Sequence, residues 1–184
     1  AFGEALPKRL EFSPLAAFWC SEIGPLNQVI HVWPYADVEE RNRVRKEAAE
    51  AGVWPPQGGD VILDMRSEIF TSKTSFPALE PGDYGPYYEM RTYVLEPGSV
   101  GRMEKRWDEA LGARTAISPL AGIFFSEFGA LNQWVHIWPY KSLDDRAEAR
   151  AEGKRQGVWP PAGESPVIAQ ESKILIPAPF SPMQ

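Results

Sequence analysis

The sequence predicts an α+β protein built from two tandem copies of one strand–helix–strand–strand–helix–strand unit. The first observation is an internal repeat, because residues 13–35 read SPLAAFWCSEIGPLNQVIHVWPY and residues 118–140 read SPLAGIFFSEFGALNQWVHIWPY. The second is the order of helical and strand patterns along each copy. The third is that the central strands are apolar on both faces, so each sheet needs a cover on both sides.

The repeat divides the chain into domain-sized parts, since each residue of the first copy has its counterpart 105 positions later. We predict a first domain at 1–75, a linker rich in proline and glycine at 76–86 and a second domain at 87–184. The first domain has no counterpart of Tyr87–Arg106, a strand and half a helix. We expect the sequence to begin partway into a longer chain, because a sheet without its first strand exposes a pairing-prone edge.

The second copy opens with an alternating aromatic and β-branched segment, Tyr87–Leu95, which predicts a strand. A Glu-Pro-Gly-Ser turn follows, and apolar residues at every fourth position predict a helix over Val100–Leu111 with Ser99 as its N-cap. The first copy retains only the tail of this helix, Phe2–Arg9. Two apolar strands joined by a short turn come next in each copy. We expect them at Leu15–Ile23, Asn27–Trp33, Leu120–Phe128 and Asn132–Trp138.

The second helix of each copy carries start and stop signals. Asp37 and Ser142 are the expected N-caps, since an acidic residue stands three positions after each of them. Gly52 and Gly157 are expected in the left-handed backbone region that terminates a helix. The last strands are expected at Val61–Phe70 and Val167–Ile176.

This order of elements is the ferredoxin-like arrangement, in which two helices cover one face of a four-stranded sheet. The other copy can cover the second face of each sheet. We therefore predict two ferredoxin-like domains packed as an intramolecular pseudo-dimer, with their sheets face to face or rolled into a barrel. A homodimer or a larger oligomer of the whole chain is a further expectation.

The composition disfavours several classes of partner and compartment. A net charge of −6 and a pI of about 5.1 disfavour binding to nucleic-acid phosphates or to an anionic membrane surface. No apolar run is long enough to span a bilayer. The single cysteine, Cys20, cannot form an internal disulfide, and Phe125 replaces it in the second copy, which predicts a small apolar filler. We therefore expect a reducing compartment and a cytoplasmic protein.

Three motifs carry a resemblance to a known family: Tyr88–Tyr93, Glu127–Gln133 and His136–Tyr140, with Arg146 and Arg150 on the helix that follows. Together with their counterparts in the first copy, they make nearly the whole chain similar to the NIPSNAP family, as two tandem domains. The resemblance implies membership of the dimeric α/β-barrel superfamily and a biochemical activity that is poorly defined. Other branches of that superfamily include cofactor-independent monooxygenases, haem-degrading enzymes and isomerases, but fold analogy transfers none of these activities.

The only two histidines, His31 and His136, stand at matched positions on a predicted strand. One interpretation is a structural histidine that is hydrogen-bonded inside an apolar sheet. Another is a catalytic acid–base group or a hydrogen-bond donor to a substrate, because histidine titrates near neutral pH. Metal or haem ligation is a third. No cysteine pair, second histidine or carboxylate cluster stands at ligand spacing, so we expect no metal and no cofactor.

A set of aromatic residues recurs around the histidines: Trp33, Tyr35, Trp138 and Tyr140. These side chains are candidates to line an apolar cavity for a planar ligand, because each combines an aromatic ring with one polar atom. The alternative is packing in the core.

Two arginine pairs recur on the second helix of each copy: Arg41 with Arg45, and Arg146 with Arg150. A spacing of four residues places each pair on one helical stripe. One interpretation is a clamp for a ligand carboxylate. The other is ion pairing to nearby carboxylates such as Asp37, Glu40 or Glu22.

These patterns predict a protein of undefined biochemical activity that binds a small anionic or aromatic molecule. Two alternatives stay open: a cofactor-independent monooxygenase or isomerase that uses His31 or His136, and a non-catalytic scaffold or interaction protein. No glycine-rich phosphate loop and no Ser-His-Asp constellation can be assigned, so no nucleotide, nicotinamide or flavin function is supported.

Overall fold

The computed structural model describes residues 1–184 and confirms the predicted α+β class. We call residues 1–75 unit 1 and residues 87–184 unit 2. The elements of unit 1 are α1 (Phe2–Arg9), β1 (Ala17–Ile23), β2 (Val29–Val32), α2 (Val38–Glu50), a short 3-10 turn (Gly59–Val61) and β3 (Ile69–Thr71). Those of unit 2 are β4 (Tyr87–Leu95), α3 (Val100–Thr115), β5 (Gly122–Phe128), β6 (Gln133–Tyr140), α4 (Leu143–Arg155) and β7 (Val167–Pro177).

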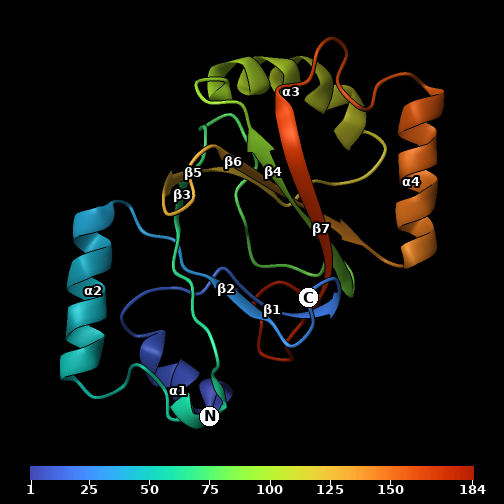
Figure 1. Ribbon diagram of the computed structural model, residues 1–184. Helices are drawn as coiled ribbons and strands as arrows, with labels where there is room; N and C mark the ends of the chain where they lie inside the picture. Colours follow the sequence, from blue (N-terminus) through green and yellow to red (C-terminus); the bar gives the residue numbers. More distant parts are fainter.

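The strands of both units form one antiparallel sheet in the order β2-β1-β7-β4-β6-β5-β3. The four strands of unit 2 follow the ferredoxin-like order within it. The sheet curls, and the helices lie along its outer side (Figure 1). The predicted ferredoxin-like α/β barrel is therefore confirmed.

The two units are joined by pairing between their edge strands, because β7 of unit 2 pairs with β1 of unit 1, and β3 of unit 1 pairs with β5 of unit 2. The two pairings share one register: Cys20 lies opposite Ile176, and Thr71 lies opposite Phe125. Cys20 and Phe125 are counterparts in the repeat, and so are Thr71 and Ile176, so the two pairings are equivalent. The units are thus related by an approximate two-fold axis within one chain.

Alternation along the strands separates an inner from an outer face of the sheet. The inner face carries a buried apolar cluster whose members include Trp19, Tyr88, Ile137, Leu175 and, from the C-terminal segment, Met183. The outer face of unit 2 packs under α3 in a second cluster around Trp107, Trp134 and Trp138. No helix of the protein combines the length and the apolar surface that crossing a membrane requires.

The capping predictions for the second helices are confirmed, and the one for α3 is wrong. Asp37 accepts a hydrogen bond from the Glu40 amide at 2.7 Å, and Ser142 accepts one from the Asp145 amide at 3.0 Å. Ser99 does not cap α3, because its hydroxyl donates to the Glu96 carbonyl of the preceding turn at 2.7 Å. Gly52 and Gly157 both have a φ of 67°, as the stop signals predict.

Two predictions for unit 1 are wrong because unit 1 has no counterpart of β4 and of the first half of α3. The strand expected over Val61–Phe70 is formed only at Ile69–Thr71, because no strand lies where β4 pairs with β7 in unit 2. Cys20 is exposed and is not an apolar filler. Its counterpart Phe125 packs in the cluster under α3, which has 16 residues, whereas α1 has 8.

We expect Ile137→Ala to lower the free energy of unfolding by about 2–5 kcal/mol, because the side chain is buried inside the barrel and its removal leaves a cavity. The matched variant Val32→Ala, at the counterpart position on β2, should cost less, since Val32 is only half-buried. Urea denaturation of both variants measures the difference. A larger loss for Val32→Ala would contradict the described placement of the core.

Candidate functional site

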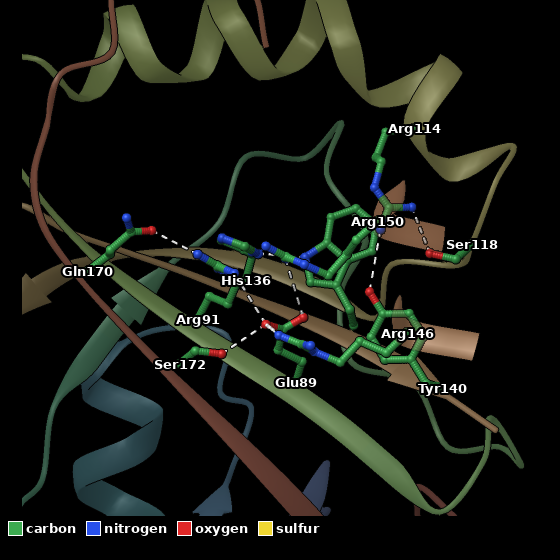
Figure 2. A network of polar contacts seen from close by, with 11 residues as sticks. Glu89, Arg91, Arg114, Ser118, His136, Tyr140, Arg146, Arg150, Gln170 and Ser172 are labelled. Atoms are coloured by element: carbon green, nitrogen blue, oxygen red, sulfur yellow. Dashed lines mark hydrogen bonds and ion pairs between the residues drawn. The ribbon is translucent and has the colours of Figure 1, made fainter. Parts of the chain in front are cut away.

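The polar residues of unit 2 gather on the outer face of the sheet, between β4, β6, β7 and the helix α4 (Figure 2). On β4, alternation turns Glu89, Arg91 and Tyr93 toward this side, whereas Tyr88 lies in the inner cluster. On β6, His136 lies on the outer face together with Trp134 and Trp138, which stand two positions before and after it. The site is therefore built on paired strands of the sheet.

Glu89 is the centre of the cluster, and its side chain is 0 % exposed. Its Oε1 atom accepts hydrogen bonds from Arg146 at 2.7 Å, from Ser172 at 2.8 Å and from Arg91 at 3.2 Å. Its Oε2 atom has no hydrogen-bond partner and lies 3.8 Å from a guanidinium nitrogen of Arg150. One carboxylate thus binds side chains from β4, β7 and α4 together.

The cluster contains more positive than negative charge, because three guanidinium groups face one carboxylate. Burial by itself would raise the pKa of Glu89, but its hydrogen bonds to Arg146 and Ser172 and the charges of Arg146 and Arg150 outweigh burial, so the pKa is lowered. The hydrogen bond to Glu89 raises the pKa of Arg146 in turn. Arg150 is 41 % exposed and its charge is the least neutralised.

His136 is buried beside this cluster and is a neutral hydrogen-bond donor. Its Nδ1 atom lies 2.6 Å from the indole nitrogen of Trp138, which can only donate, so Nδ1 accepts and the proton is on Nε2. Burial lowers its pKa well below the ordinary 6.5, and the charges of Arg91, Arg150 and Arg114 lower it further. The buried Nε2 atom has no partner in the protein.

Arg114 at the end of α3 is a second buried cation, and no carboxylate pairs with it. Its guanidinium lies 4.2 Å from the ring centre of Trp138 and donates to Ser118 at 2.7 Å and to Tyr140 at 3.4 Å. Burial lowers the pKa of Arg114 and raises that of Tyr140. Trp138 and Tyr140 therefore both hold Arg114, and Trp138 also fixes the orientation of His136.

Unit 1 repeats the arrangement around Arg114, with Arg9 in the place of Arg114. Arg9 donates to Ser13 at 2.9 Å and to Tyr35 at 3.0 Å, and it lies 4.3 Å from the ring centre of Trp33. Trp33 in turn donates to Nδ1 of His31 at 2.7 Å. The Arg–Trp–His chain is thus common to both units.

The Glu89 cluster is not repeated in unit 1, where no strand supplies the carboxylate. Arg41 instead contacts Asn42 at 3.1 Å and Ser67 at 3.5 Å, and Arg45 is exposed and forms no ion pair. His31 is more exposed than His136, but aromatic rings cover part of its imidazole. This partial burial and the charges of Arg45 and Arg9 lower its pKa. The structure brings all the predicted site residues of unit 2 together. In unit 1 it joins His31, Trp33 and Tyr35 through Arg9, whereas Arg41 and Arg45 have no carboxylate partner.

A surface hollow of about 650 Å³ lies on the other flank of α4 and does not contain His136 or the arginine cluster. Tyr140 is the only predicted site residue that lines it. Its charged lining is mixed: Lys141, Asp145, Glu148, Glu152 and Arg155. No three histidine, cysteine or carboxylate side chains come together in a way that could hold a metal ion.

Four residues of the site are missing from the sequence-based candidates: Glu89, Arg91, Arg114 and Ser172. One signal for the first two is that a glutamate and an arginine alternate with tyrosine on a single face of an otherwise apolar strand. Two of the carboxylates proposed as partners of the helix arginines bind backbone amides instead. Asp37 caps α2, and Glu40 accepts a hydrogen bond from the Ala36 amide at 2.6 Å.

Residues 1–76 and 88–182 match the NIPSNAP family profile. The human protein NipSnap homolog 3B is 28 % identical over 197 residues, covering 100 % of this chain and 80 % of the human protein. Protein NipSnap of Drosophila melanogaster is 30 % identical over 181 residues, covering 92 % of this chain and 65 % of the fly protein.

Solved structures show the same relationship. A NIPSNAP family protein with unknown function from Agrobacterium tumefaciens is 37 % identical, with a TM-score of 0.51, and the match covers 55 % of this chain and 96 % of that protein. A proposed monooxygenase from Fusobacterium nucleatum matches 96 % of this chain and 84 % of its own, with a TM-score of 0.54. Its identity is 8 %, so this similarity concerns the fold alone.

We expect Glu89→Gln to lower the free energy of unfolding by about 3 kcal/mol, because removal of a buried carboxylate leaves its arginines unpaired. The variant should also lose part of the acid sensitivity of the protein. The pKa of Glu89 is lower in the folded than in the unfolded state, so its stabilisation is present above the ordinary pKa of 4.5 and is lost as the pH falls through the folded value. Chemical denaturation between pH 3 and 7 measures both effects.

The exposed Glu127→Gln is the control for this experiment, because Glu127 forms no ion pair. It should leave the stability and its pH dependence unchanged. Identical pH profiles for Glu89→Gln and the wild type would contradict the described role of Glu89.

Nitrogen NMR of the imidazoles should show His136 neutral and protonated at Nε2 throughout pH 5–8, because Trp138 occupies Nδ1 and burial opposes its charged form. His31 serves as the internal control and should protonate at a higher pH than His136, since the pKa of His31 is lowered less strongly. A proton on Nδ1 of His136, or titration of His136 near 6.5, would refute the assignment.

Proposed function

Because the chain belongs to the NIPSNAP family, whose solved member above has no known function, we propose its activity from the site alone: it binds a small anionic molecule at unit 2. The observation that carries the proposal is the ratio of three guanidinium groups to one carboxylate around Glu89. This local excess of positive charge stands in a chain whose net charge is −6.

The arrangement of the three arginines suits an anion that approaches from solvent. Arg146 is committed to Glu89 by a short hydrogen bond, whereas Arg150 is 3.8 Å from the carboxylate and 41 % exposed. Arg91 is mostly buried and also donates to Gln170 at 2.7 Å, which fixes its plane. A ligand carboxylate can bind Arg150 through two parallel hydrogen bonds without displacing the Arg146–Glu89 pair.

The surroundings of His136 add a preference for an aromatic or carbonyl-bearing anion. The imidazole contacts the rings of Tyr93 and Trp107, at centroid distances of 4.8 and 4.7 Å. Its Nε2–H is a buried donor without a partner, which costs free energy unless an acceptor binds to it. We propose that His136 donates this hydrogen bond to the ligand.

The neutral state of His136 also favours binding over the oxygenase or isomerase alternative. A general base at this position needs an unprotonated nitrogen facing the substrate, whereas Trp138 occupies Nδ1 and Nε2 carries the proton. The catalytic roles of His31 and His136 are predictions from the sequence and stay so.

We expect the wild-type protein to bind at least one anion from a panel of benzoate, 2-naphthoate and citrate, with quenching of the tryptophan fluorescence beside the site. Arg150→Ala should weaken that binding about tenfold, equivalent to about 1.4 kcal/mol, because it removes the accessible charge. Arg45→Ala, the counterpart in unit 1, is the matched control and should bind as the wild type does. Isothermal titration calorimetry gives the affinities.

A neutral amide of the same ring, 2-naphthamide, tests the role of the charge. Equal affinities for 2-naphthoate and 2-naphthamide would refute the anion site. Absence of saturable binding across the panel, or an equal loss in both arginine variants, would instead support the scaffold alternative.

A further inference from the structure

We propose that the 650 Å³ hollow beside α4 is a second binding site of unit 2, and that its ligand is a small zwitterion with an apolar body, as in an amino acid or a dipeptide. Volumes of about 300–1,000 Å³ are typical of small-molecule sites. Neither Glu89 nor His136 lines this hollow, so the proposal is independent of the anion site.

One wall of the hollow carries two hydroxyl groups with a buried cation behind them. Arg114 is 2 % exposed and donates to both Ser118 and Tyr140, which line the hollow (Figure 2). Because a guanidinium group can only donate, both hydroxyl oxygens accept from it and keep their own protons. At most one of these protons can be used between the two hydroxyl groups, so at least one is left to donate to a ligand.

This wall suits a carboxylate. No carboxylate of the protein pairs with Arg114, and a buried cation without a counter-charge costs free energy. Burial raises the pKa of Tyr140, so its phenol keeps the proton at neutral pH. Lys141, the next residue, also lines the hollow and is exposed. A ligand carboxylate here would accept from a hydroxyl group and bring negative charge close to Arg114.

A second wall is the face of α4 that carries two unpaired carboxylates. Asp145 and Glu148 both line the hollow, and a spacing of three residues places them on one face of the helix. Neither side chain forms an ion pair, whereas Glu152, one turn further along, is paired with Arg155. Asp145 and Glu148 are therefore available to bind an ammonium group of the ligand.

The counterpart positions in unit 1 show that these charges need not be left unpaired. Glu40 stands in the place of Asp145, and it accepts a hydrogen bond from a backbone amide at 2.6 Å. Arg43 stands in the place of Glu148, and it pairs with Glu47 at 3.1 Å. Unit 1 satisfies both positions internally, whereas unit 2 leaves both to a ligand.

The rest of the lining includes apolar side chains and rings: Tyr84, Ile117, Pro119, Pro139 and Ala149. An inorganic ion would leave this surface in contact with water, whereas an apolar group of the ligand would cover it. The ligand therefore combines a carboxylate and an ammonium group with an apolar side chain, as phenylalanine and leucine do.

Isothermal titration calorimetry with L-phenylalanine, L-leucine and the dipeptide Gly-Phe tests the class of ligand. We expect saturable binding of at least one of them. The amide of that molecule lacks the carboxylate, and its deaminated acid lacks the ammonium group. Each analogue should bind about tenfold more weakly than the parent, because each loses one of the two charges. Absence of binding by all three parents, or equal affinity of the parent and either analogue, would overturn the proposal.

Variants of the protein then locate the contact. Glu148→Gln, which alters only an exposed side chain, and Tyr140→Phe should each weaken binding about fivefold, because each removes one partner of the ligand. Asp144→Asn is the matched control and should bind as the wild type does, since Asp144 is exposed on the same helix but does not line the hollow. An unaltered affinity in either hollow variant would contradict the proposal.

Backbone amide NMR of the wild type separates the hollow from the anion site. The zwitterion should shift the signals of residues 117–119 and 139–141 and leave those of residues 89–93 unchanged. Shifts confined to residues 89–93 would place the ligand at the Glu89 cluster and would overturn the proposal.

Discussion

The pairing of edge strands between the two units is the constraint on which the rest of the structure depends. Because β7 pairs with β1 and β3 pairs with β5, the apolar inner faces of both units close on one another. All helices must then lie outside, and polar chemistry can develop only between the sheet and those helices. The Glu89 cluster lies in that layer, held by strands that belong to one continuous sheet.

Most elements could be predicted because their signals are local. The caps at Asp37 and Ser142 and the terminating Gly52 and Gly157 act within a few residues of the chain, and the repeat supplied each of them twice. The extent of β3 could not be predicted in this way. The pattern over Val61–Phe70 is that of a strand, but a strand also needs a neighbour, and whether one is present depends on residues far away in the sequence.

The site shows the same division. The stripe of Arg146 and Arg150 on α4 was predictable from helical spacing, but their carboxylate is Glu89, 57 residues from Arg146 in the sequence. The contact of Trp138 with His136 joins residues two positions apart on one face of a strand, so alternation places the pair. That the indole donates to the imidazole, and so sets which nitrogen is protonated, depends on side-chain geometry that spacing does not contain.

The joining of both units in one chain has a genetic consequence. In an assembly of two identical chains, every substitution appears twice, so neither copy of a site can change alone. Here the approximate two-fold axis relates two different segments, and each can accumulate mutations separately. The buried Trp134 of unit 2 already corresponds to the exposed Val29 of unit 1. Duplication within the gene thus lets one half preserve a geometry while the other half diverges.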